Sequence, residues 1–185
     1  GGQRMMPPVN VARREQIFEV WIRTLPNAQA VFALRAAVHE LRDLIEGGMT
    51  VAEFELTRSF LDKYALHFAE TMAERLGYAI DDRFYDVPLP GHLQRAREML
   101  AELTLDDVNT ALQRHLRADK LKIAIVTGEP DAIRAELTSG EPSAVVYDTP
   151  KAAELLEADR VIATTALDVA PERISVVPVE EVFER

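Results

Sequence analysis

The sequence predicts a mixed α/β fold, an α+β sandwich in which long antiparallel helices pack on one face of a mixed sheet. Three observations predict it. Apolar and polar residues alternate over 16–24, as they do in a half-buried strand. Apolar residues recur at three- and four-residue steps over 26–46 and again over 50–69, as in amphipathic helices. Residues 120–127 have the alternation and composition of a second strand.

The first strand, within residues 16–24, has two unlike faces. One face is apolar and holds Phe18, Val20 and Ile22. The other face is mixed and holds Glu19, Trp21 and Arg23. We expect helices to bury the apolar face. Because a single strand is not stable unpaired, it must pair either with residues 120–127 or with a neighbour upstream of this chain.

Two long helices follow the first strand. Pro26 suits the first turn of a helix, and Gly47-Gly48 suits its C-terminal end. Thr50 and Glu53 then have the spacing of a capping box, which begins the next helix. The pair is predicted to form an antiparallel hairpin over the apolar face of the first strand.

The rest of the chain alternates helices with short strands. Further helices are predicted at 72–85, 93–103, 104–116, 130–137 and 152–156, with strands at 120–127, 144–147 and 174–177. The predicted domain organisation is an irregular segment at 1–15, an α/β domain at 16–147, and a C-terminal tail at 148–185 that packs on the same domain.

Composition excludes several classes of function. The net charge of −10 disfavours nucleic acid as a partner, because phosphate binding requires a basic surface. No apolar run approaches the ~20 residues that span a bilayer, so we expect a soluble chain without a membrane span. The absence of cysteine excludes disulfides, cysteine-based zinc sites and a thiol nucleophile.

The four histidines do not form a zinc-peptidase motif. His67 begins an inverted motif, His-x-x-Glu-His, but Thr71 stands where the second histidine is required. His39 is followed by a glutamate, but Asp43 takes the place of the second histidine of His-Glu-x-x-His. We therefore expect no metal and no cofactor in this chain, and read these matches as chance similarity on amphipathic helices.

Two other groups of residues have alternative interpretations. The adjacent carboxylates Asp81 and Asp82 could divide acid and base roles, or form a solvated helix end. The mixed face of Glu19, Trp21 and Arg23 could contact an extended peptide or a partner, or Trp21 could pack beneath another element. We select this mixed face as the candidate contact site and assign no catalytic residue.

The order and spacing of these elements resemble the insulinase/pitrilysin family of zinc metallopeptidases, which includes mitochondrial processing peptidase. The likeness rests on residues 49–55 opening the second long helix, on Leu-Thr-Leu-Asp-Asp-Val-Asn at 103–109, and on a strand at 121–127 that runs into Gly128. Residues 75–85 are also similar to a loop region of bacterial members. The resemblance covers most of residues 16–147 and, more loosely, the tail.

The resemblance implies a two-part enzyme in which one half carries zinc and a second half of the same fold lacks the zinc ligands. It implies that this chain is the second half: non-catalytic, substrate-enclosing, and partnered by a zinc-bearing half or subunit and by a peptide substrate. The Arg and Tyr, seven positions apart, by which the insulinase branch contacts its substrate have no counterpart here. A structural subunit of the same fold, without peptidase activity in its assembly, is the alternative. The resemblance also implies a bacterial source, with cytoplasm and periplasm both open.

Overall fold

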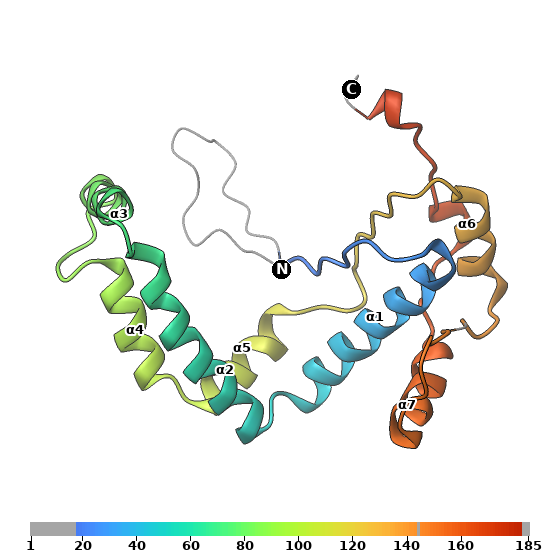
Figure 1. Cartoon of the computed structure of the whole chain (residues 1–185), viewed down its shortest axis with the longest axis horizontal. Coiled ribbons are helices and arrows are strands. Elements are labelled where there is room, and N and C mark those ends of the chain that lie inside the picture. Colours follow the sequence, from blue (N-terminus) through green and yellow to red (C-terminus); the bar gives the residue numbers. More distant parts are fainter. Residues whose placement is uncertain (1–17, 144, 183–185) are drawn as a thin grey trace. The chain divides into compact units, whose positions relative to one another are not determined.

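A computed structural model describes residues 18–143 and 145–182 (Figure 1). Within these ranges the chain forms seven α-helices and four short 3-10 helices, and it forms no strand. The described chain divides into two compact units, one made of residues 18–42 and 120–182, and the other of residues 43–119. The division does not test the domain boundaries predicted at residues 15 and 147, which stay predictions.

The predicted α/β sandwich is therefore wrong, because the described residues contain no sheet. Residues 18–24, 121–127, 145–147 and 174–177 have no strand assignment, and no ladder of backbone hydrogen bonds joins them. Residue 144 of the predicted third strand lies outside the described ranges. Alternation of apolar and polar residues indicates that a segment suits a pleated, half-buried surface. A strand also requires a second strand at hydrogen-bonding distance, which the alternation does not supply.

The first unit is organised around helix α1, Ala30–Gly47, which the 3-10 helix η1, Asn27–Gln29, precedes. The buried apolar residues of this unit come mainly from one face of α1 and are Val31, Phe32, Leu34, Val38 and, from helix α6, Ile133. Helix α6 spans Pro130–Ser139, helix α7 spans Ala153–Ala163, and the 3-10 helices η3 and η4 span Pro171–Arg173 and Val179–Glu181. The burial of Leu34 agrees with the stripe predicted from the sequence.

Hydrogen bonds over long sequence separations join the segments of this unit. Among those that involve side chains are Gln29 Nε2 to Val146 O at 3.3 Å, Arg42 Nη1 to Ala166 O at 2.7 Å, Thr127 Oγ1 to Asn27 Oδ1 at 3.0 Å, and Arg134 Nη2 to Ile174 O at 3.0 Å. Side chains rather than a sheet therefore connect the C-terminal region to α1.

The second unit consists of helices joined by short turns. Its elements are α2 at Val51–Tyr64, η2 at Ala65–Ala69, α3 at Met72–Phe84, α4 at His92–Glu102 and α5 at Leu105–His115. Helix α2 packs against α4 (Figure 1), and Arg97 Nε donates to Asp62 Oδ1 at 2.9 Å between them. Within this unit α4 is the packing partner of α2. The predicted hairpin of the first two long helices stays a prediction, because α1 lies almost entirely in the other unit.

Three capping boxes begin helices in the second unit. Thr50 with Glu53 begins α2, as predicted; Thr71 with Glu74 begins α3, and Thr104 with Asp107 begins α5. In each box, hydrogen bonds from the threonine backbone and hydroxyl hold the pKa of the acidic partner below its ordinary value. These helix starts are therefore fixed by residues three positions apart.

The turn between α1 and α2 depends on Gly48. Its φ of +70° lies in the left-handed region, and a Cβ atom there would lie 2.7 Å from Asn109 Cγ. The Asn109 side chain accepts a hydrogen bond from Met49 N at 2.8 Å and donates to Met49 O at 3.2 Å. Gly48 thus ends the helix, as predicted, and also leaves room for the asparagine that holds the turn.

Candidate functional site

The three predicted contact residues meet on one side of an extended segment. Residues 18–23 have no helical or turn assignment, so side chains two positions apart project to the same side. The Trp21 indole Nε1 donates to Glu19 Oε2 at 2.7 Å. The Arg23 guanidinium carbon lies 5.1 Å from the centre of the Trp21 ring, which is cation–π distance. The indole therefore has a carboxylate at its polar edge and a cation over its face.

This segment is open to contact on both sides. Trp21 is 59% exposed, which excludes the alternative in which it packs beneath another element of the described chain. Phe18, Val20 and Ile22 are exposed too, so the prediction that helices bury this face is wrong. The apolar face is exposed because the described residues form no sheet. A strand presents one face to a core only when neighbouring strands hold it there.

The backbone of this segment is also available. No backbone hydrogen bond joins residues 18–25 to any other described residue. Unpaired N–H and C=O groups in an extended segment are the groups that an added strand binds. The segment thus combines main-chain hydrogen-bonding groups that have no backbone partner among the described residues with an aromatic side chain, the two features that recognise an extended peptide.

The residues considered for metal binding have structural roles instead. Thr71, at the position of the missing histidine, is the N-cap of α3, where its hydroxyl accepts from Glu74 N. His67 Nδ1 contacts Glu70 Oε1 three residues along. Across the ranges 18–143 and 145–182, no group of three or more His, Cys, Asp or Glu side chains is placed to hold a metal ion. The residues do not fit a zinc site, so we derive no step that uses zinc in this chain.

Asp82 joins α3 to α4. Its Oδ1 accepts from His92 N at 3.1 Å and lies 2.5 Å from His92 Nδ1, so it caps a helix that begins at that histidine. Desolvation raises the pKa of Asp82, but the hydrogen bonds from the His92 ring and backbone outweigh it and hold the pKa below its ordinary value. The neighbouring Asp81 is exposed. A capping role explains Asp82 without acid–base chemistry.

Two buried polar side chains in the first unit escaped the sequence analysis. Arg35 of α1 is 5% exposed, and Ser143 is 3% exposed. Arg35 donates to Glu141 O at 2.9 Å and to Thr165 O at 3.1 Å. Arg35 Nε and Ser143 Oγ are buried and have no hydrogen-bond partner in the part of the chain that the structure describes. The signal was present in the sequence, because Arg35 lies four residues after Val31 and three before Val38, within the apolar stripe.

Comparison of the chain with protein-family models, with curated proteins and with solved structures found no match. The resemblance to insulinase-type peptidases therefore stays a hypothesis, and the fold that it implied is not the fold of the described residues. Within that part of the chain, no helix combines the length and hydropathy needed to cross a bilayer.

Proposed function

We propose that this chain is a non-catalytic domain that holds an extended peptide along residues 18–24 by strand addition. In this proposal the peptide is cleaved elsewhere, by a zinc-bearing domain or subunit of the kind that the resemblance to insulinase-type peptidases implies. The observation that carries the proposal is the Glu19–Trp21–Arg23 cluster on an extended segment whose backbone has no partner among the described residues.

The chemistry of the segment suits this role. An added strand would satisfy the free N–H and C=O groups, and those bonds do not depend on the sequence of the bound peptide. Trp21 offers a large apolar surface, and Glu19 and Arg23 restrict how its ring turns. A domain that fixes the path of a peptide assists catalysis by placing the scissile carbonyl before the reacting group, without touching that carbonyl.

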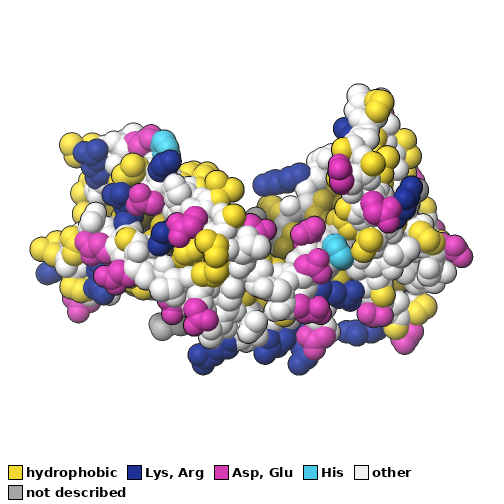
Figure 2. Space-filling model, turned by 90° about the horizontal axis from the view of Figure 1, so that it is seen from below, with side chains coloured by type: hydrophobic (Ala, Val, Ile, Leu, Met, Phe, Trp, Pro, Cys, Tyr) yellow, Lys and Arg dark blue, Asp and Glu magenta, His cyan; other side chains and the backbone are white. Residues whose placement is uncertain are grey.

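A purely structural role is the second candidate. It is favoured by the many large apolar side chains exposed in the second unit, including Leu56, Phe60, Leu66, Met72 and Leu76, because surfaces of this kind mark contacts with other proteins. Figure 2 shows hydrophobic side chains gathered at several places on one face. This role predicts assembly without peptide binding at residues 18–24.

Trp21 makes a direct test possible, because it is the single tryptophan of the chain. The full chain is titrated with decapeptides of alternating apolar and charged residues, while tryptophan emission and amide hydrogen exchange are followed. Strand addition should shift the emission and slow exchange at alternate amides of residues 18–24. Arg23→Ala should weaken binding, while Glu172→Ala, an exposed change elsewhere in the unit, should not.

Two results would contradict the proposal. Emission that changes without protection of any amide in 18–24 would mean contact with the ring alone. Peptide cleavage by this chain by itself, insensitive to a metal chelator, would mean that the domain is catalytic. Mixing the chain with a zinc-bearing half of its parent protein, and measuring whether cleavage of a quenched peptide increases, separates a peptide-holding role from a structural one.

A further inference from the structure

The extended segment before α1, residues 18–24, carries opposite charges placed symmetrically about its tryptophan. Glu19 lies two positions before Trp21 and Arg23 two positions after it, on the same side of the chain. They are the only charged residues of the segment. Among the described residues, neither of them forms an ion pair. Two opposite charges, ~13 Å apart in an extended chain, are therefore available to a partner that carries the reverse order of charge.

A second copy of the same segment has that reverse order when it runs antiparallel. With the two Trp21 residues opposite each other, Glu19 of each copy faces Arg23 of the other, so the same pair forms twice. A parallel arrangement in register would instead set glutamate against glutamate and arginine against arginine, and like charges directly opposite destabilise a pair of strands. Charge therefore selects both the antiparallel direction and the register.

The other side of the segment is complementary in the same register. Val20 of one copy lies opposite Ile22 of the other, and β-branched side chains suit cross-strand packing. Phe18 lies opposite Thr24, where a bend ends the extended stretch. Because Phe18, Val20 and Ile22 are exposed, pairing would remove apolar surface from water on this side as well.

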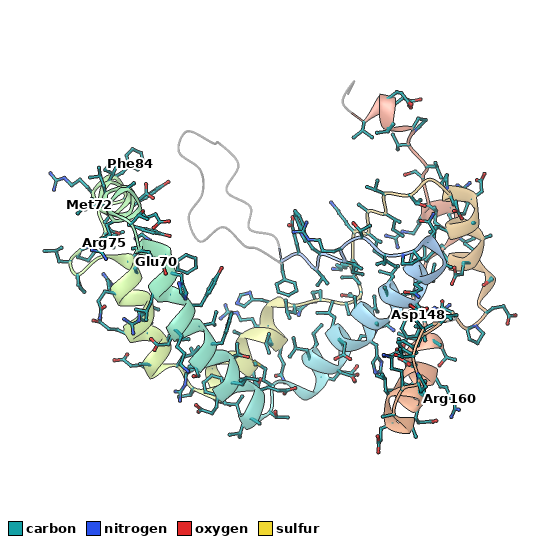
Figure 3. The ribbon with its side chains drawn as sticks, in the orientation of Figure 1. Glu70, Met72, Arg75, Phe84, Asp148 and Arg160 are labelled. Carbon is teal, nitrogen blue, oxygen red and sulfur yellow. The ribbon has the colours of Figure 1, made fainter. Side chains whose placement is uncertain are left out.

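The main chain of the segment is suited to pairing with a second copy. Residues 18–25 make no backbone hydrogen bond to any other described residue. Figure 3 shows the segment as a stretch of chain that leads into the start of α1. It contains no proline, so each of its residues can donate a hydrogen bond to a neighbouring strand. An unpaired edge of this kind is a template for pairing with another chain.

We propose that residues 18–24 are a self-association edge, through which two copies of this chain pair as antiparallel strands about a two-fold axis at Trp21. The two indoles lie beside each other, and Glu19 of each copy pairs with Arg23 of the other on either side of them. A dimer and a bound peptide would use the same main-chain groups and so exclude each other. This competition rests on the proposed function, whereas the pairing itself does not.

The self-association is expected to be weak. A ribbon of only two strands is marginally stable in water, and an edge of this length buries less surface than a permanent dimer does. We expect a dissociation constant on the order of 0.1–1 mM. The edge of a copy at micromolar concentration then stays open to a peptide, whereas at high local concentration a second copy takes the place of the peptide.

Charge reversal tests the pairing. Sedimentation velocity is measured on the full chain from roughly 10 to 500 μM, in salt of about 0.15 M. Glu19→Arg alone and Arg23→Glu alone should each weaken self-association at least ~10-fold, because each sets like charges opposite each other at two positions. An equimolar mixture of the two variants should associate as the natural chain does, since opposite charges then meet at both positions.

The controls match the change in net charge, because copies of a chain with a net charge of −10 repel one another. Glu172→Arg and Arg173→Glu, at exposed positions in η3, change the net charge by the same amounts. They should alter self-association far less than the two variants in the segment do, and their mixture should show no preference for unlike copies. Circular dichroism confirms that each variant is folded.

Cross-linking measures the register directly. The chain contains no cysteine, so Val20→Cys and Ile22→Cys can each be the single thiol of a chain. When the two variants are mixed and mildly oxidised, the disulfide between unlike chains should form faster than either disulfide between like chains, because position 20 faces position 22 of the other copy.

Four results would overturn the proposal: a chain that stays monomeric at the highest concentration, self-association that either charge reversal leaves unchanged, a mixture that does not restore it, or disulfides between like chains that form as fast as the mixed one. Peptide binding is measured separately at ~1 μM chain, where the dimer is dissociated. Peptide binding without self-association would overturn this proposal alone, and self-association without peptide binding would overturn the proposed function alone.

Discussion

Replacing Arg35 by methionine tests how the first unit is held together. The guanidinium is almost fully buried and donates to Glu141 O and Thr165 O, so it joins α1 to two segments more than 100 residues away. Methionine has similar length and preserves packing, but it donates no hydrogen bond. The change therefore isolates the polar contribution of this side chain.

The magnitude follows from three opposing effects. Two hydrogen bonds from a charged donor contribute about 1.5–3 kcal/mol each. Arg35 Nε is buried and has no hydrogen-bond partner among the described residues, which costs the natural chain about 1–3 kcal/mol. Methionine has no such donor, so the variant is spared this cost. Since Glu141 is exposed, water also replaces part of the lost bonding at its carbonyl. We expect Arg35→Met to lower the free energy of unfolding by about 1–3 kcal/mol.

The assay is urea unfolding followed by circular dichroism, with Arg42→Met as the control. Arg42 lies on the same helix and donates to Ala166 O in a similar way, but 30% of its side chain is exposed, so its replacement should cost less than ~1 kcal/mol. With a slope of about 2 kcal/mol per molar urea, Arg35→Met should lower the midpoint by about 0.5–1.5 M. Equal midpoints for the two variants, or a more stable Arg35→Met, would refute this account of the buried arginine.

Three further predictions concern the second unit. Phe54→Ala should lower the free energy of unfolding by about 3–5 kcal/mol in urea, because Phe54 is buried. Phe60→Ala, at an exposed position, should lower it by about 1 kcal/mol or less. Similar losses for both variants would contradict the burial of Phe54. Gly48→Ala should destabilise the folded chain by about 1–2 kcal/mol, because Gly48 has a positive φ. Gly47→Ala should stabilise it by about 0.5–1 kcal/mol, because Gly47 is helical and has open space around it. A change of the same sign in both variants would contradict the turn geometry. The capping-box carboxylates have pKa values in the folded chain that lie below their ordinary values; the ordinary value for Glu53 is 4.5. The stability that they contribute is therefore fully present above the ordinary pKa, and it is lost as pH falls through the lower pKa of the folded state. Helical circular dichroism should therefore decline below about pH 4.5, and Glu53→Gln should flatten that decline; superimposable acid titrations would exclude this contribution.

The helices could be predicted from the sequence because their signals are local. Thr50 and Glu53 satisfy each other within one turn, and Gly48 ends the preceding helix by its own backbone conformation. Distant residues have little effect on either signal. The predicted helix at 152–156 was too short, since α7 continues to Ala163. Its later turns place Asp159 at a buried position, where it accepts from Tyr147 Oη at 2.9 Å, and the polar residue breaks the apolar periodicity.

The sheet could not be predicted because pairing is a property of two segments. Phe18, Val20 and Ile22 have the alternation of a strand, yet nothing in that pattern specifies a partner. The candidate site fared differently. Contact between Glu19, Trp21 and Arg23 follows from the two-residue period of any extended chain. The prediction that these residues lie on one side therefore does not depend on the sheet. The place of Arg35 within the apolar stripe was a local signal of its burial, but its contacts at 141 and 165 could not be predicted, because no local pattern specifies partners so far along the chain.

The connectivity of the two units has a consequence for the order in which the chain folds. The second unit is one continuous stretch, residues 43–119, and three of its helices have local start signals, so it can form while the chain is still being synthesised. The first unit is built from residues 18–42 and residues 120–182, and it cannot close until the later segment has left the ribosome. Prior folding of the second unit shortens the loop that must then be closed, and so lowers the entropic barrier to assembling the first. Residues 18–42 would therefore be the earliest part of this pair to be made and among the last to find their partners.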